Sequence, residues 1–294
     1  MKIGITTDCS SAIEYSSFKH NIKVTRTTIH FGDKEYIDGV DLNAEGFYKK
    51  LAETDIVPTT SAPSPQELIS KAEEWKKEGC TDVIHFPISF KLSAYGENLE
   101  AVSDDYVDGI NYHVFDCHSA CQPEAYCAHY AEILANKGYT VEQIFAACQK
   151  LTDNACEYFV VDDLKYLVKN GRLNAASGFI GSLVKIKPIL CLGKSGKIDV
   201  YEKVRTRNRA IERTIDIVRE QTKDAKKVIY LIQHSNCDDD AKALKERLES
   251  EFTNGVKFDV AIVPPTIGAH IGGGIISIGY IILDGLEHSD ELIK

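Results

Sequence analysis

Residues 264–281 read Pro-Pro-Thr-Ile-Gly-Ala-His-Ile-Gly-Gly-Gly-Ile-Ile-Ser-Ile-Gly-Tyr-Ile, and this is the most informative stretch of the chain. His270 stands here among apolar residues and glycines. Because glycine has no Cβ, Gly272, Gly273 and Gly274 allow a sharp turn and a close approach of the backbone to another group. The flanking isoleucines predict a strand or another buried segment, where a free charge is costly. His270 is therefore either a core histidine bonded to a backbone carbonyl or a contact for a ligand.

The composition is that of a globular protein without nucleic-acid or membrane character. The 294 residues, 44% hydrophobic and 27% charged, suffice for one large or two ordinary domains with a substantial core. A net charge of −10 and the lack of a Lys/Arg-rich block argue against a nucleic acid as partner. The N-terminus has no signal-peptide pattern, and no apolar run approaches the roughly 20 residues of a membrane helix. We therefore expect no transmembrane anchor.

The cysteines indicate a reducing compartment. There are nine of them, an odd number, and no pair has Cys-x-x-Cys spacing. Free thiols in the cytoplasm are the simplest interpretation. Cys117, His118, Cys121 and Cys127 form a cluster that could suggest zinc, but no second pair of ligands follows it, so we expect no metal site.

Strand and helix patterns alternate along the chain and predict an α/β fold of two domains, residues 1–156 and 157–294. In the first domain, strand patterns at 3–7, 83–86 and 113–116 each precede a helical pattern, which is typical of a parallel sheet flanked by helices. The helical patterns of this domain cover 43–53, 65–78, 92–106, 123–136 and 141–151. Ser64 before Pro65 predicts an N-cap followed by a first-turn proline.

The second domain predicts a mixed sheet with helices. Strands 189–192 and 197–201 enclose Gly-Lys-Ser-Gly at 193–196, which indicates a hairpin. The other strand patterns of this domain cover 157–161, 228–233 and 257–263. Its helical patterns cover 162–168, 175–184, 208–221 and 238–251.

Three further segments carry hydroxyls or cations where a ligand site would need them. Thr59-Thr60-Ser61-Ala62-Pro63-Ser64 leads into a helix, and capping explains only the last of its hydroxyls. The segment 88–95, which contains Ser93, follows a strand of the first domain, and ligands of open α/β sheets gather at the carboxyl ends of strands. There a hydroxyl at a helix N-terminus binds anions well, although simple capping stays an alternative. Arg172 follows an Asn-Gly helix stop.

Together these segments resemble the DegV family, the fatty-acid-binding subunits of bacterial fatty acid kinases, over almost the whole chain. The motifs that carry this resemblance are Thr-Asp-Cys-Ser-Ser (7–11), Thr-Ser-Ala-Pro-Ser-Pro (60–65), Leu-Ser-Ala-Tyr (92–95), Phe-Asp-Cys-His-Ser-Ala (115–120), Asn-Gly-Arg-Leu (170–173) followed by Lys-Ile-Lys-Pro-Ile-Leu (185–190), and Ile-Gly-Ala-His-Ile-Gly-Gly-Gly (267–274).

The resemblance implies that one long-chain fatty acid lies between the two domains, with no other cofactor. Its carboxyl group would meet Thr60, Ser61, Ser93 and His270. A tail of about fourteen methylenes, at roughly 0.8 kcal/mol each, would contribute about 11 kcal/mol before association costs. A net hydrogen bond contributes only about 0.5–1.5 kcal/mol, so the head-group residues would mainly set the orientation of the ligand.

An apolar tunnel is needed for the tail, and ordinary core packing is the alternative explanation for the residues that could form it. The candidates are Phe159, Phe179, Ile180, Leu183, Ile186, Ile275 and Ile276.

The resemblance further implies a carrier that presents its ligand to a separate kinase, which transfers phosphate from ATP to the carboxyl group. The chain has no phosphate-binding loop and no set of kinase motifs, in keeping with a protein that is not itself an enzyme. Arg172, Arg205 and Arg207 could meet the added phosphate or the kinase, since arginine presents a planar fork of donors. The alternative for Arg205 and Arg207 is a solvated start of helix 208–221.

Two other functions stay open at this point. The first is a serine hydrolase acting on acyl esters, with Ser93 as nucleophile and His270 as base, although nothing like Gly-x-Ser-x-Gly surrounds Ser93. The second is a sensor that binds a small molecule other than a lipid.

Overall fold

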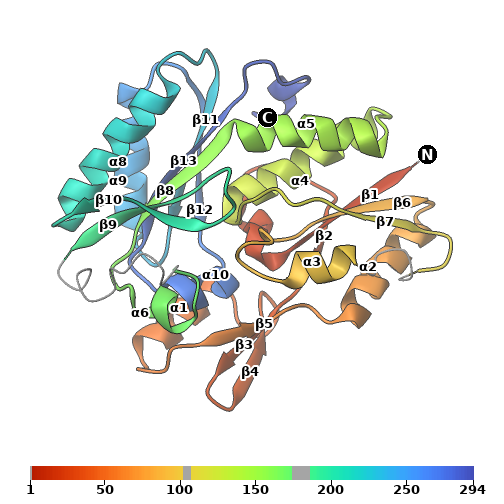
Figure 1. The fold of residues 1–294 in the computed structure, drawn as a ribbon, viewed down its shortest axis with the longest axis horizontal. Coiled ribbons are helices and arrows are strands. Elements are labelled where there is room, and N and C mark those ends of the chain that lie inside the picture. The colour runs from red at the N-terminus through yellow and green to blue at the C-terminus, as the bar shows by residue number, and fades with distance from the viewer. Residues whose placement is uncertain (1, 102–106, 174–185) are drawn as a thin grey trace.

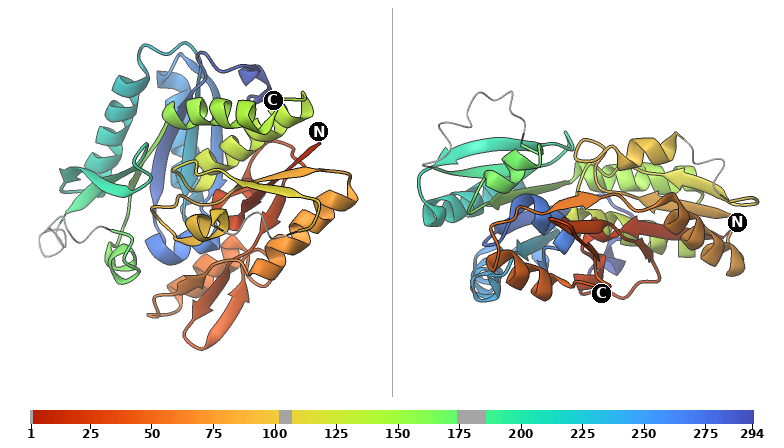
Figure 2. Two further views of the ribbon diagram at one scale, coloured as in Figure 1. Left: turned by 45° about the vertical axis from the view of Figure 1, so that its right-hand side comes forward. Right: turned by 90° about the horizontal axis from the view of Figure 1, so that it is seen from below.

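The computed structural model describes residues 2–101, 107–173 and 186–294. It consists of two α/β halves that lie side by side (Figure 1 and Figure 2). The strands are β1 (Ile3–Asp8), β2 (Lys23–Thr25), β3 (Thr28–Phe31), β4 (Lys34–Ile37), β5 (Thr59–Ser61), β6 (Asp82–Phe86), β7 (Asn111–Val114), β8 (Ala155–Val160), β9 (Lys187–Leu192), β10 (Ile198–Val204), β11 (Val228–His234), β12 (Gly255–Ile262) and β13 (Ile276–Ile282).

The helices alternate with these strands through most of the chain. They are α1 (Ala44–Ala52), α2 (Pro65–Lys77), α3 (Tyr95–Glu100), α4 (Cys121–Asn136), α5 (Val141–Asp153), α6 (Lys165–Lys169), α8 (Arg207–Thr222), α9 (Asp238–Glu251) and α10 (Pro265–Ile271), with short 3-10 turns at η1 (Cys9–Ser11), η2 (Ile13–Tyr15) and η5 (Ser289–Glu291).

The N-terminal half is built on the parallel sheet that the sequence predicts. Its strand order is β2-β1-β6-β7, and all three pairings are parallel. β1 and β6 are almost entirely buried, as is usual for parallel strands covered on both faces. α2 begins as predicted, since the Ser64 hydroxyl accepts a hydrogen bond from the Glu67 N–H at 3.2 Å and Pro65 occupies the first turn.

A small antiparallel sheet, in the order β4-β3-β5, is an addition that the sequence patterns did not reveal. Its strands have only three or four residues, too few to show a clear alternation. β5 pairs with β3 so that Thr60 lies opposite Ile29. This pairing decides which way the side chains of the Thr-Ser segment point.

The C-terminal half has the predicted mixed sheet with helices, in the order β10-β9-β8-β13-β11-β12. Only β11 and β12 pair in parallel among its described strands. β9 and β10 form the expected hairpin. Gly196 in its turn has φ +66°, and a Cβ there would lie 2.5 Å from the Ser89 hydroxyl, so only glycine fits where the hairpin meets the N-terminal half.

Helix α4 lies between the two sheets and joins them into one core (Figure 1). Thirteen of its sixteen residues are buried, so it has almost no solvent face. Its residue Tyr126 belongs to the same apolar cluster as Ile5 and Ile84 of one sheet and Leu231 of the other. The two halves are therefore packed together through a shared helix. The division at residue 156 stays a prediction.

The stretch around His270 differs from its simplest interpretation. Residues 265–271 form α10, and only 276–282 form a strand. Two prolines start the helix, because proline suits its first turn, and Gly272 at φ +85° ends it. The expected helix 92–106 begins later, as α3, and residues 102–106 are outside the described part of the chain, as is the expected helix 175–184.

Candidate functional site

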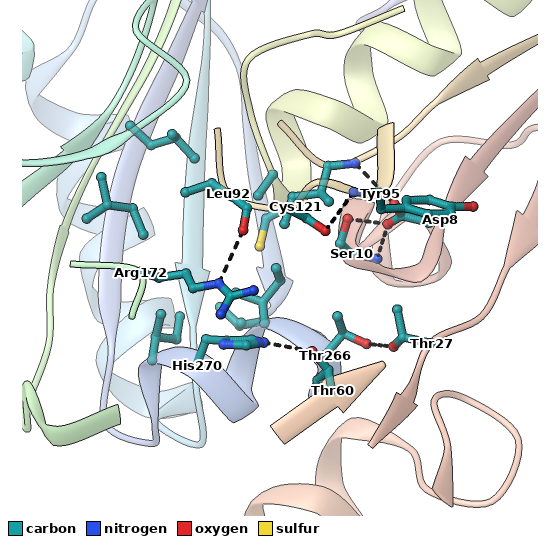
Figure 3. Close-up of a pocket in the computed structure, with 18 of the residues that line it drawn as sticks. Asp8, Ser10, Thr27, Thr60, Leu92, Tyr95, Cys121, Arg172, Thr266 and His270 are labelled. Atoms are coloured by element: carbon teal, nitrogen blue, oxygen red, sulfur yellow. Dashed lines mark hydrogen bonds between the residues drawn. The ribbon is translucent and has the colours of Figure 1, made fainter. Parts of the chain in front are cut away.

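A cavity lies between the two halves (Figure 3). It encloses about 1010 Å³ free of protein atoms, a volume that includes the part open to solvent. Its lining comes from both halves and is mostly apolar. The apolar lining residues are Ala62, Pro63, Ile88, Leu92, Ala120, Phe159, Leu192, Ile198, Val263, Ile267, Ile271 and Ile275.

His270 and Thr60 meet in the lining of the cavity (Figure 3). His270 is in the last turn of α10, and its Nε2 lies 2.8 Å from Thr60 Oγ1 on β5. Burial, and then the nearby charge of Arg172, lower the pKa of His270 to about 4. A neutral imidazole has one N–H donor and one acceptor nitrogen, so either the Thr60 hydroxyl or the imidazole Nδ1 keeps a proton to donate elsewhere. Nδ1 has no hydrogen-bond partner within the described chain.

The N-terminus of α10 is fixed by a carboxyl group from the other half. Asp38, directly after β4, accepts a hydrogen bond from the Thr266 N–H at 2.8 Å and another from the Thr266 hydroxyl. The residue before the helix, Pro264, has no capping side chain, so Asp38 takes that role. Burial raises the pKa of Asp38 to about 6. Sequence reasoning missed this link, because no local pattern connects residues 228 positions apart.

Ser93 lies in the loop between β6 and α3 and contributes a hydroxyl to the same cavity. Its Oγ accepts a hydrogen bond from the Tyr95 N–H at 3.2 Å, while none of the described residues accepts the Ser93 proton. The loop is held by buried Asp8, whose Oδ2 accepts from the Ile88 N–H at 3.1 Å. Asp8, in the opening motif of the chain, thus fixes the segment that carries Ser93.

Arg172 adds a positive charge beside these groups (Figure 3). Its Nε donates to the Leu92 carbonyl of the other half at 3.2 Å. No ion pair forms between Arg172 and an acid in the described part of the protein. Its Nη1 donates to the Asn170 carbonyl.

The other two predicted arginines lie outside the cavity lining. Arg207 forms ion pairs with Asp162 at 3.4 Å and Asp240 at 3.1 Å. Arg205 is exposed in a shallow surface depression that Arg209 and Arg213 also line. The fixed charge of Arg207 is thus already partly neutralised.

Two predicted residues point away from the cavity because successive strand residues face opposite sides. Ser61, next to Thr60, has its Oγ 2.7 Å from His30 Nε2 on the outer side of β5. Ile276, next to Ile275, packs in the cluster beneath α8. Phe159 and Ile275 line the cavity.

The remaining predicted residues have different positions. Ile186 is half-buried and packs on the cluster next to the cavity without lining it. Phe179, Ile180 and Leu183 are outside the described residues. Gly272 and Gly274 approach the Tyr166 ring and the Asp162 carboxyl of this chain at positive φ, whereas Gly273 faces open space.

The sequence reasoning also missed the polar residues at the sheet side of the cavity. Glu157 and Ser277 both line it, and the Ser277 hydroxyl donates to Glu157 Oε1 at 2.6 Å. Burial raises the pKa of Glu157 to about 7. An acid within a strand pattern gives no local signal that its carboxyl group faces a cavity.

No metal centre and no membrane span are found in the part of the chain that the structure describes. Nowhere in 2–101, 107–173 and 186–294 do three or more His, Cys, Asp or Glu side chains gather as metal ligands would. Within the same ranges, every helix is too short or too polar to cross a bilayer. All nine cysteines are free thiols.

Comparison with known proteins assigns the fold and the motifs to one family. The DegV family profile, described as an uncharacterised protein family, matches residues 2–283. A DegV domain-containing protein of Staphylococcus aureus is 32% identical over 284 residues, covering 96% of this chain and 98% of its own length.

Two solved structures show the same fold. The fatty acid binding DegV family protein of Streptococcus agalactiae superposes with a TM-score of 0.84 at 30% identity, over 96% of this chain and 99% of its own. The fatty acid kinase B3 protein of Streptococcus pneumoniae, solved loaded with linoleic acid, has a TM-score of 0.80 over 96% of this chain and all of its own. At 18% identity the latter shows the likeness of the fold alone.

Proposed function

Because the chain belongs to the DegV family, we propose that it binds one long-chain fatty acid in the cavity between its halves and presents the carboxyl group to a separate kinase. The product of that kinase would be an acyl phosphate, which this protein carries. The chain itself would act as a lipid-binding carrier in the cytoplasm. Its nine cysteines are free thiols, and the cytoplasm keeps thiols reduced.

The observation that carries this proposal is the presence of hydrogen-bond donors from several segments in one apolar cavity. Thr60 with His270, and Ser93 from a different segment, all line this cavity. A carboxylate withdrawn from water needs such donors, since an unpaired buried charge is costly. Neutral His270 supplies a hydrogen bond without adding a second full charge to the site.

The apolar lining fits an acyl chain. Phe159, Ile275 and their apolar neighbours would contribute most of the affinity, at about 0.8 kcal/mol per buried methylene. The hydroxyls and the imidazole would then fix which end of the ligand faces Arg172.

Arg172 is the residue that we assign to the phosphate. It lies beside His270 and has no acidic partner among the described residues, so it can meet an anion without first breaking an ion pair. Arg205 and Arg207 lie outside the cavity and suit contact with the kinase subunit instead.

The serine hydrolase alternative lacks its geometry. Among the described residues, no hydrogen bond joins Ser93 to His270, and no carboxylate accepts from the His270 ring. Nε2 is instead bonded to Thr60. A nucleophile, base and orienting acid are therefore not assembled.

The test is to identify what the purified protein binds. The protein is denatured and extracted, and the extract is analysed by mass spectrometry; the delipidated protein is then titrated with palmitate and oleate. We expect a co-purifying fatty acid, or uptake of an added one in a ratio of one to one. A different small molecule in the extract, with no uptake of either acid, would establish the sensor alternative and reject the proposal.

A matched pair of variants tests the head-group site. Thr60→Val removes a hydroxyl that lines the cavity, and Ser61→Ala removes the neighbouring hydroxyl that points away from it. We expect the first to weaken palmitate binding about three- to tenfold, the size of one net hydrogen bond, and the second to change it less than about twofold. An equal effect of both would place the carboxyl group elsewhere.

A further inference from the structure

Three polar side chains share the face of the C-terminal sheet that borders the cavity. In the strand pairings, Ser277 of β13 lies opposite Gln233 of β11 and opposite Phe159 of β8. Glu157 is two residues before Phe159 and therefore points to the same face. Glu157 Oε1 accepts hydrogen bonds from the Ser277 hydroxyl and from Gln233 Nε2.

The second carboxyl oxygen of Glu157 is the unusual feature of this group. Glu157 is only 7% exposed and lines the cavity. Both hydrogen bonds to its side chain go to Oε1, and Oε2 has none with any residue that the structure describes. Oε2 has accessible surface, and Glu157 lines the cavity, so this oxygen can accept a hydrogen bond from a polar atom placed there.

A buried group next to Gln233 lacks hydrogen-bond partners. The Gln122 backbone N–H donates to Gln233 Oε1 at 3.2 Å, which places the start of α4 against the three polar side chains. Both polar atoms of the Gln122 side-chain amide lack a partner within the described residues, although the residue is fully buried. Gln122 and Gln233 are not lining residues, so within this group Glu157 and Ser277 are the side chains that offer polar atoms to the cavity.

Glu157 and Ser277 are polar residues in a cavity lining that is mostly apolar. Phe159, Leu192 and Ala120 are lining residues of the same cavity. An unsubstituted acyl chain would pass these side chains well but would leave Glu157 Oε2 without a hydrogen bond. A site built to bond a polar group discriminates against a ligand that lacks it, because its own polar atoms are then unpaired.

We propose that Glu157 and Ser277 form a hydroxyl-binding subsite in the acyl part of the cavity, so that the protein prefers a long-chain fatty acid with a hydroxyl group on its chain to the unsubstituted acid. This inference rests on the proposed function, because it presumes that the cavity holds a fatty acid.

A hydroxyl fits this position better than other polar groups. It can donate to the carboxylate form of Glu157 and can accept from the protonated form, so it bonds to the group in either state. Carbonyl or epoxide oxygens only accept. A second carboxylate on the ligand would face the Glu157 carboxyl group, and none of the described lining residues near it carries a compensating positive charge.

Ser277 is on a different element from the head-group residue His270. Ser277 is in β13 and His270 is in the last turn of α10, with the glycines 272–274 between the two elements. We therefore expect a preference for a hydroxyl within the chain and not at the carbon next to the carboxyl group.

The test compares stearic acid with a series of hydroxystearic acids whose hydroxyl group moves along the chain. Each acid competes with a fluorescent fatty acid for the delipidated full-length protein. At the best one or two positions we expect binding about tenfold tighter than that of stearic acid, with little gain elsewhere. The same affinity at every position would overturn the inference, and would show that the polar group is satisfied without the ligand.

Variants of Glu157 and Ser277 test whether these two residues cause the preference for the hydroxylated acid. Glu157→Leu should reduce the ratio of the two affinities to about one, and Ser277→Ala should reduce it in part. Glu157→Gln keeps a group that donates and accepts, so it should keep most of the preference; it also serves if the leucine variant fails to fold. Thr60→Val should weaken both acids and leave their ratio unchanged. An unchanged ratio in Glu157→Leu and Ser277→Ala would reject the assignment.

The two proposals fail in different ways. If the wild-type protein binds neither stearic acid nor any hydroxystearic acid, the proposed function is wrong. If it binds stearic acid but shows no preference for a hydroxyl position, the fatty acid function stands and only this inference is rejected.

Discussion

The two polar parts of the cavity lining are built in different ways. Thr60, Ser93 and His270, the proposed head-group end, come from three separate segments, and their positions depend on the docking of the two halves. Glu157 and Ser277, the proposed hydroxyl subsite, are on neighbouring strands of a single sheet, which holds them in register. Burial shifts both His270 and Glu157 toward their neutral forms.

This difference indicates which part of the cavity lining can change its geometry. A site made by strand pairing is rigid, because moving one side chain means moving a ladder of hydrogen bonds. A site made by docking depends on contacts such as Asp38 with Thr266 and Arg172 with Leu92, each of which joins the halves. The head-group end is therefore the part that should respond to ligand, pH and mutation of distant residues.

The largest expected effect is an opposite dependence of stability on pH for His270 and Glu157. The pKa of His270 is lowered from 6.5 to about 4, so its contribution is present above pH 6.5 and is lost as the pH falls toward 4. The pKa of Glu157 is raised from 4.5 to about 7, so its contribution is present below pH 4.5 and is lost as the pH rises through 7. Each contribution is roughly 3 kcal/mol, because a tenfold change in proton affinity corresponds to about 1.4 kcal/mol.

Urea unfolding from pH 4 to 8 measures this contrast. The stability of the wild-type protein minus that of His270→Gln should fall with decreasing pH. The corresponding difference for Glu157→Gln should fall with increasing pH. Slopes of the same sign would show that one of the two groups is not buried as described.

Removal of the ligand should give the next largest effect, because the bound acid contacts both halves. At a hundredfold excess over Kd, a ligand stabilises the folded state by about 2.7 kcal/mol. For a chain of this size we expect Tm to rise by about 5–10 °C when palmitate is added to the delipidated protein. Calorimetry with and without palmitate gives the shift. An unchanged Tm at saturating palmitate would contradict binding between the halves.

Asp38→Ala should destabilise the protein by about 2 kcal/mol and disturb only the head-group end. The substitution leaves the buried Thr266 N–H and hydroxyl without their acceptor. The exposed Asp33→Ala, in the turn between β3 and β4, is the control, with an expected effect below about 0.5 kcal/mol. Denaturant unfolding gives the stability, and palmitate affinity reports on His270. If both variants behave alike, Asp38 does not position α10.

The smallest expected effect on binding comes from the head-group side chains themselves. His270→Ala and Ser93→Ala should each weaken palmitate binding by about 1 kcal/mol, since each removes one hydrogen bond and leaves the tail contacts intact. Their effect on acyl phosphate formation should be larger, because presentation of the carboxyl group is then misaligned. A bacterial fatty acid kinase that phosphorylates the wild-type complex, with ATP and hydroxylamine trapping, measures this. Equal losses in binding and phosphorylation would leave these residues without a role in presentation.

Local patterns in the sequence were sufficient for most of the architecture. The parallel sheet, the mixed sheet, the Ser64 cap and the hairpin at 193–196 all follow from short-range periodicity and turn residues. The motif order also identified the family, because these motifs keep their order and spacing along almost the whole chain. Thr60, Ser93, Arg172 and His270 were found in the same way, and the fold brings all four to one cavity.

What the tertiary structure decided is which side chains of each segment face the cavity. Thr60 points in and Ser61 out because β5 pairs with β3 in one register, and a short strand does not reveal its register in its own residues. The link from Asp38 to α10, and the open oxygen of Glu157, arise only when distant segments pack together. Burial, pairing and the pKa shifts that follow from them are properties of the surroundings of a residue, and those surroundings are supplied by other parts of the chain.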